Sequence, residues 1–407
     1  MIETTGSNNI PHLRPNPDWT GLPIFDRTGW QRVRFGDVVA NLNKTERDPA
    51  EAGIERFIGL EHLEPGSLHI RTWGNVADGT TFTRRCRPGQ VLFGKRRAYQ
   101  RKVAVAEFDA VVSGDIYVLA PKDDRLMPEL LPFICLSERF FQYAVETSAG
   151  SLSPRTSWKH LAEFEFGLPP LEQQRRIAEV FWAVDDACCK IAGMAGKSAA
   201  FRKSYLRSVF DNPNGNSSLP VRETGLVQLG RQRAPKYQTG TMAKPYLRVA
   251  NVFDGCFNYD DVLEMDFDEK DFGTYSLQKG DILLNEGQSR ELVGRCAIYD
   301  GAIEDCCFQN TLIRYRAGEK VLTEYAYAFF QYCFHFGVFA AIASQTTSVA
   351  HLGADRFGNL SMQVPPEEEQ RKIAHKYRRL CETELRLRQH LGKIQDLQKN
   401  IIESVLA

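Results

Sequence analysis

The chain has 407 residues, a formal net charge of zero and a hydrophobic fraction of 43%, as expected for a globular protein of two or three domains. Zero net charge argues against non-specific nucleic-acid binding by the chain as a whole. No apolar run is long enough to span a bilayer, and residues 1–29 lack the apolar core of a signal peptide, so we expect a cytoplasmic protein.

The ten cysteines and eight histidines show no spacing that is typical of a metal or redox site. Two cysteine pairs are adjacent, Cys188-Cys189 and Cys306-Cys307, but no C-x-x-C is present. Buried, reduced thiols are therefore the expected state. The sequence predicts no metal in this chain.

Residues 1–29 are predicted to be an irregular extension, followed by a mixed α/β domain at residues 30–167. Four strand-like runs are bounded by Gly and Pro, at residues 56–60, 90–93, 103–105 and 116–119. Residues 130–145 carry apolar and aromatic side chains at helical spacing.

A proline-proline motif follows this domain and occurs twice. It reads LPPLEQQRRIA from Leu168 to Ala178, and VPPEEEQRKIA from Val364 to Ala374. Proline pairs disfavour helix just upstream, whereas Pro and Glu both suit a helix start. Each motif therefore predicts an extended arm that turns into a helix.

Two long helices are predicted after these motifs, within residues 168–212 and 364–407. Steps of three and four from Ile177 and from Ile373 meet apolar residues at eight of ten positions in each helix, among them Val180, Val184, Met194, Phe201, Tyr377 and Leu391. Such seams are typical of a coiled coil, so we expect the helices to pack on each other and to run antiparallel. The alternative is two ordinary amphipathic surface helices.

A turn-rich linker at residues 211–218 precedes a second copy of the whole pattern. The strand-like and helical runs of residues 30–167 recur in the same order at residues 213–363, at an offset that drifts only from 188 to 196. This is a tandem duplication of one unit, a globular domain plus a long helix.

Local charge is segregated although the total is zero. Residues 84–106 hold eight basic residues and no acidic one, and residues 231–253 hold five basic residues and no acidic one. Residues 254–271 hold eight acidic residues and one Lys. We expect the acidic stretch to face away from any DNA.

Two variable domains that alternate with two helices, each helix preceded by the proline-proline motif, resemble the specificity subunit of a type I restriction–modification system. The resemblance covers residues 30–407 and implies a mixed α/β fold, with two target-recognition domains (30–167 and 213–363) separated by a pair of long antiparallel coiled-coil helices. It implies that each domain reads one half of a split DNA target, while the helices set the spacer.

The same resemblance implies that this chain is not an enzyme. Two methyltransferase subunits would dock on it, with or without restriction subunits, and S-adenosylmethionine, ATP and Mg would belong to those partners. The sequence agrees, because it has no Gly-rich cofactor loop and no complete P-loop. The second motif departs from the first at Glu367, which replaces Leu171. Docking is therefore not expected to be equivalent on the two motifs.

Candidate DNA contacts are the basic, hydroxyl and amide side chains that can bind phosphates or base edges. In the first domain they are Arg84, Arg85, Lys95, Arg96, Arg97, Tyr99, Arg101, Lys102, Ser153, Arg155 and Thr156. In the second domain they are Arg231, Arg233, Lys236, Asn285, Gln288, Ser289, Arg290, Thr346, Thr347 and Ser348. Candidate docking residues are Pro169, Pro170, Gln173, Gln174, Arg175, Pro365, Pro366, Gln370 and Arg371. The competing interpretation is a coiled-coil scaffold that joins proteins and reads no nucleic acid.

Overall fold

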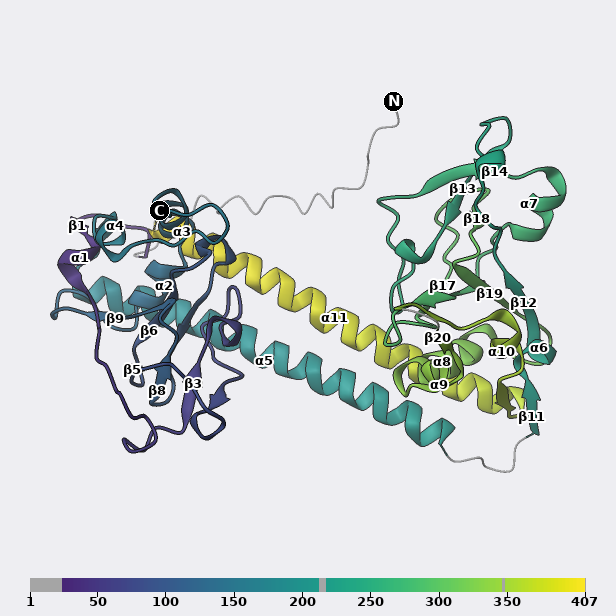
Figure 1. The fold of residues 1–407 in the computed structure, drawn as a ribbon, viewed down its shortest axis with the longest axis horizontal. Coiled ribbons are helices and arrows are strands. Elements are labelled where there is room, and N and C mark those ends of the chain that lie inside the picture. Colours follow the sequence, from purple (N-terminus) through teal and green to yellow (C-terminus); the bar gives the residue numbers. More distant parts are fainter. Residues whose placement is uncertain (1–23, 212–216, 346–347, 407) are drawn as a thin grey trace. The chain divides into compact units, whose positions relative to one another are not determined.

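The computed structural model describes residues 24–211, 217–345 and 348–406 and divides into two compact units (Figure 1). Unit 1 comprises the residues up to Ile191 together with those from His390 onward, and unit 2 comprises Ala192–Gln389. Each unit contains one globular domain, the start of the long helix that follows it in the chain, and the end of the other long helix. The predicted mixed α/β fold with tandem domains is confirmed.

The domain of unit 1 is built on two four-stranded sheets. In spatial order, one sheet holds β2 (Val39–Asn41), β9 (Ile116–Pro121), β6 (Val91–Gly94) and β7 (Val103–Val105), and the other holds β4 (Gly74–Asn75), β3 (Arg56–Ile58), β8 (Ala110–Val112) and β5 (Arg84–Cys86). All four predicted strands are present. A separate ribbon pairs β1 (Gln31–Arg34) with β10 (Glu165–Leu168) in antiparallel register, so the arm that ends in Pro169 is tied to the start of the domain.

Four short helices complete this domain: α1 (Phe35–Val38), α2 (Leu131–Leu136), α3 (Glu138–Glu146) and α4 (Trp158–Leu161). The single helix predicted at residues 130–145 is wrong, because Ser137 divides it. Ser137 has an extended backbone, with φ −61° and ψ 145°, and its side chain accepts a hydrogen bond from the Phe140 N–H. Serine thus caps a new helix rather than continuing the old one.

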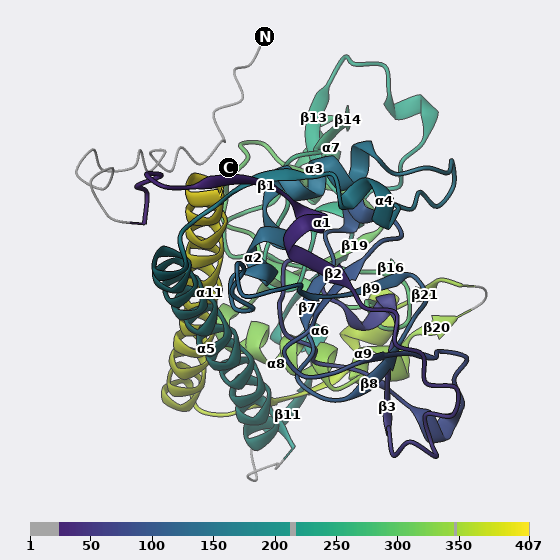
Figure 2. The ribbon, with the colours of Figure 1, turned by 90° about the vertical axis from the view of Figure 1, so that its left-hand side faces the viewer.

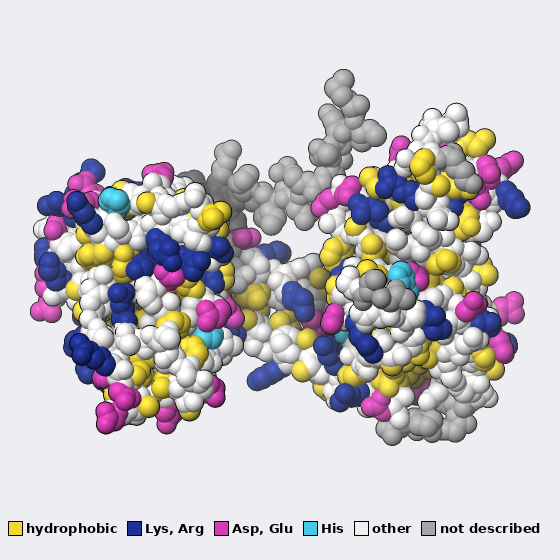
Figure 3. All heavy atoms as spheres, viewed as in Figure 1, with side chains coloured by type: hydrophobic (Ala, Val, Ile, Leu, Met, Phe, Trp, Pro, Cys, Tyr) yellow, Lys and Arg dark blue, Asp and Glu magenta, His cyan; other side chains and the backbone are white. Residues whose placement is uncertain are grey.

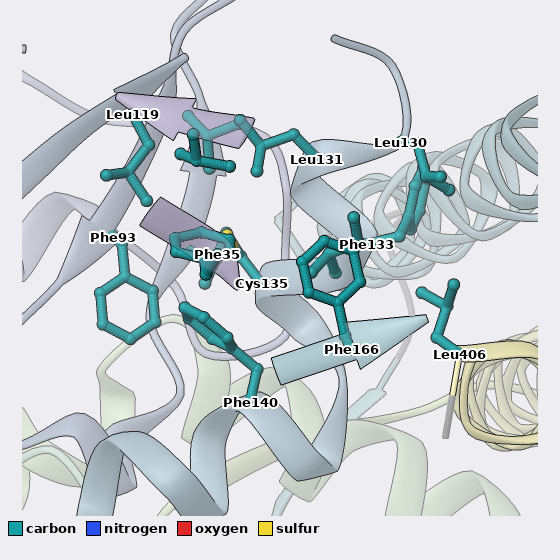
Figure 4. Packing of buried hydrophobic residues seen from close by; sticks show 14 of the residues in the cluster. Phe35, Phe93, Leu119, Leu130, Leu131, Phe133, Cys135, Phe140, Phe166 and Leu406 are labelled. Carbon is teal, nitrogen blue, oxygen red and sulfur yellow. The ribbon is translucent and has the colours of Figure 1, made fainter. Parts of the chain in front are cut away.

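The core of unit 1 is rich in aromatic side chains (Figure 4). Phe35, Phe93, Phe133 and Phe140 are fully buried, and the Phe35 and Phe140 rings lie 4.7 Å apart between centroids. Leu406, from the far end of the chain, belongs to the same cluster. Of the predicted N-terminal extension, residues 1–23 lie outside the described residues, whereas Ile24 and Phe25 pack against this core.

The domain of unit 2 repeats this plan. Its strands are β12 (Gly225–Leu229), β19 (Leu312–Ala317), β15 (Ile282–Asn285) and β17 (Cys296–Ile298) in the main sheet; β14 (Leu263–Asp266), β13 (Ala243–Leu247) and β18 (Cys307–Phe308) in the second; β16 (Gly287–Gln288), β21 (Ala350–His351) and β20 (Ser344–Gln345) in a third; and β11 (Ser217–Pro220) with β22 (Ser361–Val364). Its helices are α6 (Val221–Thr224), α7 (Glu269–Tyr275), α8 (Thr323–His335), α9 (Val338–Ile342) and α10 (Ala354–Gly358).

The two long helices are α5 (Leu171–Phe210) and α11 (Glu367–Leu406). In each unit a segment of α5 lies beside a segment of α11 (Figures 1 and 2). In unit 1, Phe181 shares the core with Val405, and further along α5 the Asp185 carboxylate accepts a hydrogen bond from Gln398 at 3.2 Å. Rising numbers on α5 thus meet falling numbers on α11, and the predicted antiparallel packing is confirmed within this unit.

Unit 2 shows the same direction and an ion pair inside the helix contact. Arg202 of α5 donates to Glu384 of α11 at 2.9 Å and to the Tyr377 hydroxyl at 3.1 Å. Leu206 and Phe210 of α5 share a core with Ile373 and Tyr377 of α11. Arg202 and Glu384 are 9% and 6% exposed, so both charges are withdrawn from water.

The predicted seam on α5 is wrong by about one residue. Met194 and Phe201, which it placed inside, are 55% and 56% exposed. The buried line instead contains apolar residues and two charged ones, and it consists of Ile177, Ala178, Phe181, Asp185, Cys188, Ala195, Arg202, Leu206 and Phe210. A prediction that selects apolar residues at steps of three and four leaves out Asp185 and Arg202, because the sequence alone does not show that polar groups on α11 pair with them.

We predict that Arg202→Met lowers the free energy of unfolding by about 3 kcal/mol, because the buried Glu384 carboxylate keeps only the more exposed Arg388 as a partner. Urea unfolding followed by circular dichroism measures this loss. The double variant Arg202→Met/Glu384→Leu should recover most of it, since it removes both charges. Lys203→Met, at the exposed neighbouring position, is the control, and an equal loss in that variant would contradict the ion-pair account.

Candidate nucleic-acid interface

Two of the predicted contact loops of the first domain are joined in the structure. The loop after β6 and the loop before α4 exchange backbone hydrogen bonds, from Thr156 N–H to the Lys95 carbonyl at 3.0 Å and from Arg97 N–H to the Pro154 carbonyl at 2.7 Å. The Arg96 guanidinium also donates to Ser153 Oγ at 3.1 Å. Residues 57 or more positions apart in the chain therefore form one surface.

This surface has an excess of positive charge around one carboxylate. Asp115 accepts from Arg155 Nε at 2.9 Å and pairs with Arg96 at 3.4 Å. Burial raises the pKa of Asp115, but the two guanidinium groups outweigh burial and hold that pKa below its usual value. Burial and the nearby charge of Arg84 lower the pKa of Lys95. Figure 3 shows Lys and Arg side chains gathered on a face of this domain.

The loop after β6 is strained as well as basic. Arg97 and Arg101 have φ of 54° and 57° and flank the turn at Ala98–Gln100. A left-handed backbone at a residue with a side chain costs about 1–3 kcal/mol and is concentrated at functional sites. The Nε atoms of Arg96 and Arg97 are buried and have no hydrogen-bond partner in the structure. The guanidinium groups therefore retain hydrogen-bonding capacity that the protein does not use.

Other basic residues of the first domain are engaged by the protein. Arg84 donates to the Ile116 carbonyl at 2.7 Å, and Lys102 donates to the Leu60 carbonyl at 2.6 Å. Arg85 pairs with Asp109 at 2.5 Å, and Arg101 pairs with Glu138 at 2.8 Å. The remaining two candidates differ in access, since Tyr99 is 55% exposed and Thr156 is buried.

The second domain joins the matching loops. Leu352 N–H donates to the Glu286 carbonyl at 2.8 Å, as Thr156 does to Lys95. Gly287 pairs with His351 across β16 and β21, as Arg96 pairs with Arg155. Glu286 thus occupies the place of Lys95, and His351 occupies the place of Arg155.

The chemistry at these matching positions is different. His351 Nδ1 lies 3.0 Å from the Glu286 carboxylate, so a histidine–carboxylate pair replaces an arginine–lysine cluster. Neither Glu286 nor His351 was among the predicted contacts, although the loop of Glu286 was, because only strand pairing shows that these two residues meet.

Several predicted contacts of the second domain lie inside the protein. Asn285 is fully buried, and its amide nitrogen lies 3.4 Å from the Val252 carbonyl. Arg231 is 7% exposed, with its guanidinium 3.8 Å from the Tyr237 ring centroid and paired with Asp271. Placing these two side chains at a surface was wrong, because Asn285 belongs to the buried β15 strand and Arg231 to a carboxylate–aromatic cage.

The other candidates of the second domain are partly or fully accessible, or lie outside the description. Gln288 and Ser289 are half-buried, whereas Arg233, Arg290 and Ser348 are exposed. Thr346, Thr347 and the side chain of Lys236 lie outside the described residues.

The segregated charges of the second domain partly neutralise each other in the fold. The acidic stretch supplies Asp261 to Arg248 and Asp271 to Arg231, and Asp305 pairs with Lys244 at 2.5 Å. Three basic residues of 231–253, Arg231, Lys244 and Arg248, therefore stabilise their own domain. The excess of positive charge that the sequence showed at residues 231–253 is largely absent from the folded surface.

Each proline-proline motif contains a buried glutamine that fastens the motif to its domain. Gln174 accepts from Met127 N–H at 2.8 Å and donates to the carbonyls of Arg125 at 2.7 Å and Pro169 at 2.8 Å. Gln370 makes the same three bonds, to Leu322 at 2.9 Å, Lys320 at 3.0 Å and Pro365 at 2.9 Å.

Both glutamines are nearly inaccessible, with exposed fractions of 1% and 2%. Their assignment as docking residues is therefore wrong for this structure, because every polar atom of the amide faces the chain itself. Pro169 and Pro365 are also buried.

The remaining motif residues are more exposed. Gln173 is half-buried and accepts from the Trp30 indole N–H at 2.8 Å. Pro170, Pro366, Arg175 and Arg371 are exposed, so one proline and one arginine of the predicted docking residues are exposed in each motif. At the position where the motifs differ, Leu171 is 50% exposed.

Among the described residues, no helix is long and apolar enough to cross a membrane.

Comparison with known proteins places these features in context. The family model described as "Type I restriction modification DNA specificity domain" matches residues 28–194 and 229–395. The chain is 27% identical over 216 residues to the type I restriction enzyme EcoDI specificity subunit of Escherichia coli, a match that covers 50% of this chain and 45% of that protein. The matched region thus spans about half the length of that curated relative.

Two solved structures share the fold. One, described as "Structural basis underlying complex assembly and conformational transition of the type I R-M system", has a TM-score of 0.59 at 18% identity and covers 93% of this chain and 97% of that chain. The other is a type-I restriction-modification system S subunit from M. genitalium, with a TM-score of 0.57 at 12% identity and coverage of 93% and 96%.

We predict that Gln370→Ala destabilises unit 2 by about 3 kcal/mol, because one buried N–H and two carbonyls lose their partner. Thermal unfolding of the isolated chain measures this effect. The exposed Gln389→Ala, on the same helix, is the control and should unfold like the original chain. A docking role alone would give the opposite pattern, with normal stability and weaker partner binding.

Proposed function

Because the chain belongs to the type I restriction modification DNA specificity family, we propose that it is the DNA-recognition subunit of a type I restriction–modification complex. Each globular domain reads one half of a split target in double-stranded DNA. The chain itself is not catalytic, and S-adenosylmethionine, ATP and Mg act in partner subunits. The complex works in the cytoplasm.

The observation that best supports DNA contact is the joined loop pair of the first domain. Lys95, Arg96 and Arg155 surround a single carboxylate, so the joined loops carry an excess of positive charge. Lys and Arg bind phosphates, and Arg can donate two bonds to guanine O6 and N7. The strained backbone holds these donors in a fixed arrangement before DNA arrives.

The second domain reads its half-site with a less electrostatic surface. Its matching loop pair carries Glu286 and His351, and a carboxylate can accept a bond from the cytosine N4 amino group. Exposed Arg290 lies in the same loop and supplies a phosphate or guanine contact. We therefore expect the first domain to contribute more to affinity at low salt and the second to contribute mainly sequence discrimination.

The paired helices set the spacer and bind two methyltransferase subunits. The motif repeats at the start of α5 and α11, and its exposed residues, Arg175 and Arg371, offer matching positive charges. Leu171 and Glu367 differ in polarity at one exposed position, so the two sites bind the same partner with unequal strength. Restriction subunits would join through those partners.

We predict that Lys95→Ala with Arg155→Ala weakens binding to a duplex selected by the assembled complex and flattens its salt dependence. Each lost phosphate contact lowers the slope of log affinity against log salt by about 0.9. Fluorescence anisotropy over a salt series measures both quantities. Glu286→Ala with His351→Ala is the matched pair in the second domain and should alter sequence preference with little change in slope.

An unchanged affinity and slope in the first-domain variant would contradict the DNA role of this surface. A scaffold without nucleic-acid recognition would show no selected duplex at all, which distinguishes failure of the surface from failure of the function.

The spacer proposal predicts the effect of lengthening both helices. Four residues inserted between Lys190 and Ile191, and four between Gln389 and His390, add about one turn and 6 Å to each helix. Because both helices change together, each half keeps its present partner. We expect both half-sites to stay the same and the preferred spacer to grow by about two base pairs, at 3.4 Å per step. Sequence selection with the complex measures this, and altered half-sites with an unchanged spacer would refute it.

A further inference from the structure

Three side chains of different chemistry meet in unit 1, outside the surfaces described above. His69 comes from the loop between β3 and β4, and Asp185 and Cys189 lie one turn apart on α5. One donor atom from each lies within 4.8 Å of the other two. His69 Nε2 and Asp185 Oδ2 are 2.7 Å apart.

The histidine is held from behind by a second carboxylate. His69 Nδ1 lies 2.9 Å from Glu107 Oε1, and this contact leaves Nε2 facing Asp185 and Cys189. A carboxylate on the rear nitrogen is the usual support of a metal-binding histidine. In the absence of metal, burial lowers the pKa of His69, but Glu107 and Asp185 outweigh burial and raise that pKa.

Comparison of the two units shows that no arginine meets the buried carboxylate at this place. In unit 2, Arg202 of α5 neutralises a buried carboxylate on α11. The residue one repeat further along the chain, 196 positions later, is Gln398, whose neutral amide donates to Asp185 at 3.2 Å. Asp185 has only 8% of its side chain exposed, so in unit 1 a histidine and a neutral amide meet the buried carboxylate, whereas in unit 2 a guanidinium meets one.

The other charges around the thiol are mixed, with acidic groups in excess. The negative charges near Cys189 are Asp185, Asp186 and Glu107, and the positive charge near it is Arg71. Burial and Asp185 together raise the pKa of the Cys189 thiol. A bound cation would reverse this balance, because a coordinating thiol loses its proton to solvent.

We propose that His69 Nε2, Asp185 Oδ2 and Cys189 Sγ bind one zinc ion, with water as the fourth ligand. A nitrogen, an oxygen and a sulfur donor suit zinc, whereas Mg²⁺ and Ca²⁺ prefer oxygen alone. On binding, the Cys189 S–H bond and the His69 Nε2–H bond break, Zn–S and Zn–N bonds form, and both protons leave to solvent. Zinc–ligand distances near 2 Å require Nε2 and Oδ2 to separate to about 3.3 Å, which one rotamer adjustment of His69 provides. The ion would fasten the His69 loop to α5.

The test uses the full chain, stripped of metal by chelator and then dialysed against zinc chloride under reducing conditions. Elemental analysis should give one zinc per chain, and titration calorimetry should show proton release. His69→Gln and Cys189→Ser should each abolish the stoichiometric site, and Glu107→Gln should weaken zinc binding by about 10–100-fold. Cobalt(II) in place of zinc should show a thiolate charge-transfer band that Cys189→Ser removes.

Cys256→Ser is the control for adventitious binding, since Cys256 is an exposed thiol that should not affect the site. Circular dichroism of the metal-free variants establishes that they fold. The proposal is overturned if the original chain binds less than a stoichiometric amount of zinc, or if zinc is retained in folded His69→Gln and Cys189→Ser. Zinc lost equally from Cys256→Ser would also overturn it.

Discussion

The hydrophobic core of each globular domain is completed by the end of the long helix that follows the other domain. The core of unit 1 includes Ile402, Val405 and Leu406 from α11, and the core of unit 2 includes Leu206 and Phe210 from α5. Burial of one such side chain contributes about 1.5–3 kcal/mol, which is a large share of the net stability of a domain. The antiparallel helix pairing, the position of each proline-proline arm and the joined contact loops all depend on this exchange of helix ends.

The glutamine of each motif transmits that constraint to the domain. Gln174 and Gln370 connect three backbone segments, namely the loop after the main sheet's last strand, the proline arm and the first turn of the helix. A domain fastened in this way cannot tilt freely on its helix. The same mechanical connection is thus made once in each unit.

Much of the architecture could be predicted from local patterns. The repeated motif gave the tandem plan, apolar periodicity gave two long helices, and Gly- and Pro-bounded runs gave the strands β3, β6, β7 and β9. The seam predicted on α5 differed from the buried line of the structure because Asp185 and Arg202 are charged, and charged residues are expected to be exposed. Partners far away in the chain, Gln398 and His69 for Asp185 and Glu384 for Arg202, make burial possible.

The contact surfaces were harder to predict because sequence neighbours are not spatial neighbours. A run of positive charge at residues 231–253 looked like a DNA surface, yet Arg231 and Arg248 pair with carboxylates that follow them in the chain. In contrast, Glu286 and His351 lie 65 residues apart and form one pair only through strand pairing. The spacing rules that detect metal motifs likewise miss His69 and Asp185, which are separated by 116 residues.

The exchange of helix ends also has a consequence for how the protein is made. Residues 390–406, which complete the core of unit 1, follow about 200 residues after the last residue of α5 that belongs to this unit. At a synthesis rate of 5–20 residues per second, the ribosome adds that stretch in roughly 10–40 s. During this interval the first domain is present with an open apolar face. Chaperone binding during translation is therefore expected at this face, and the domain matures only when the second one has been synthesised.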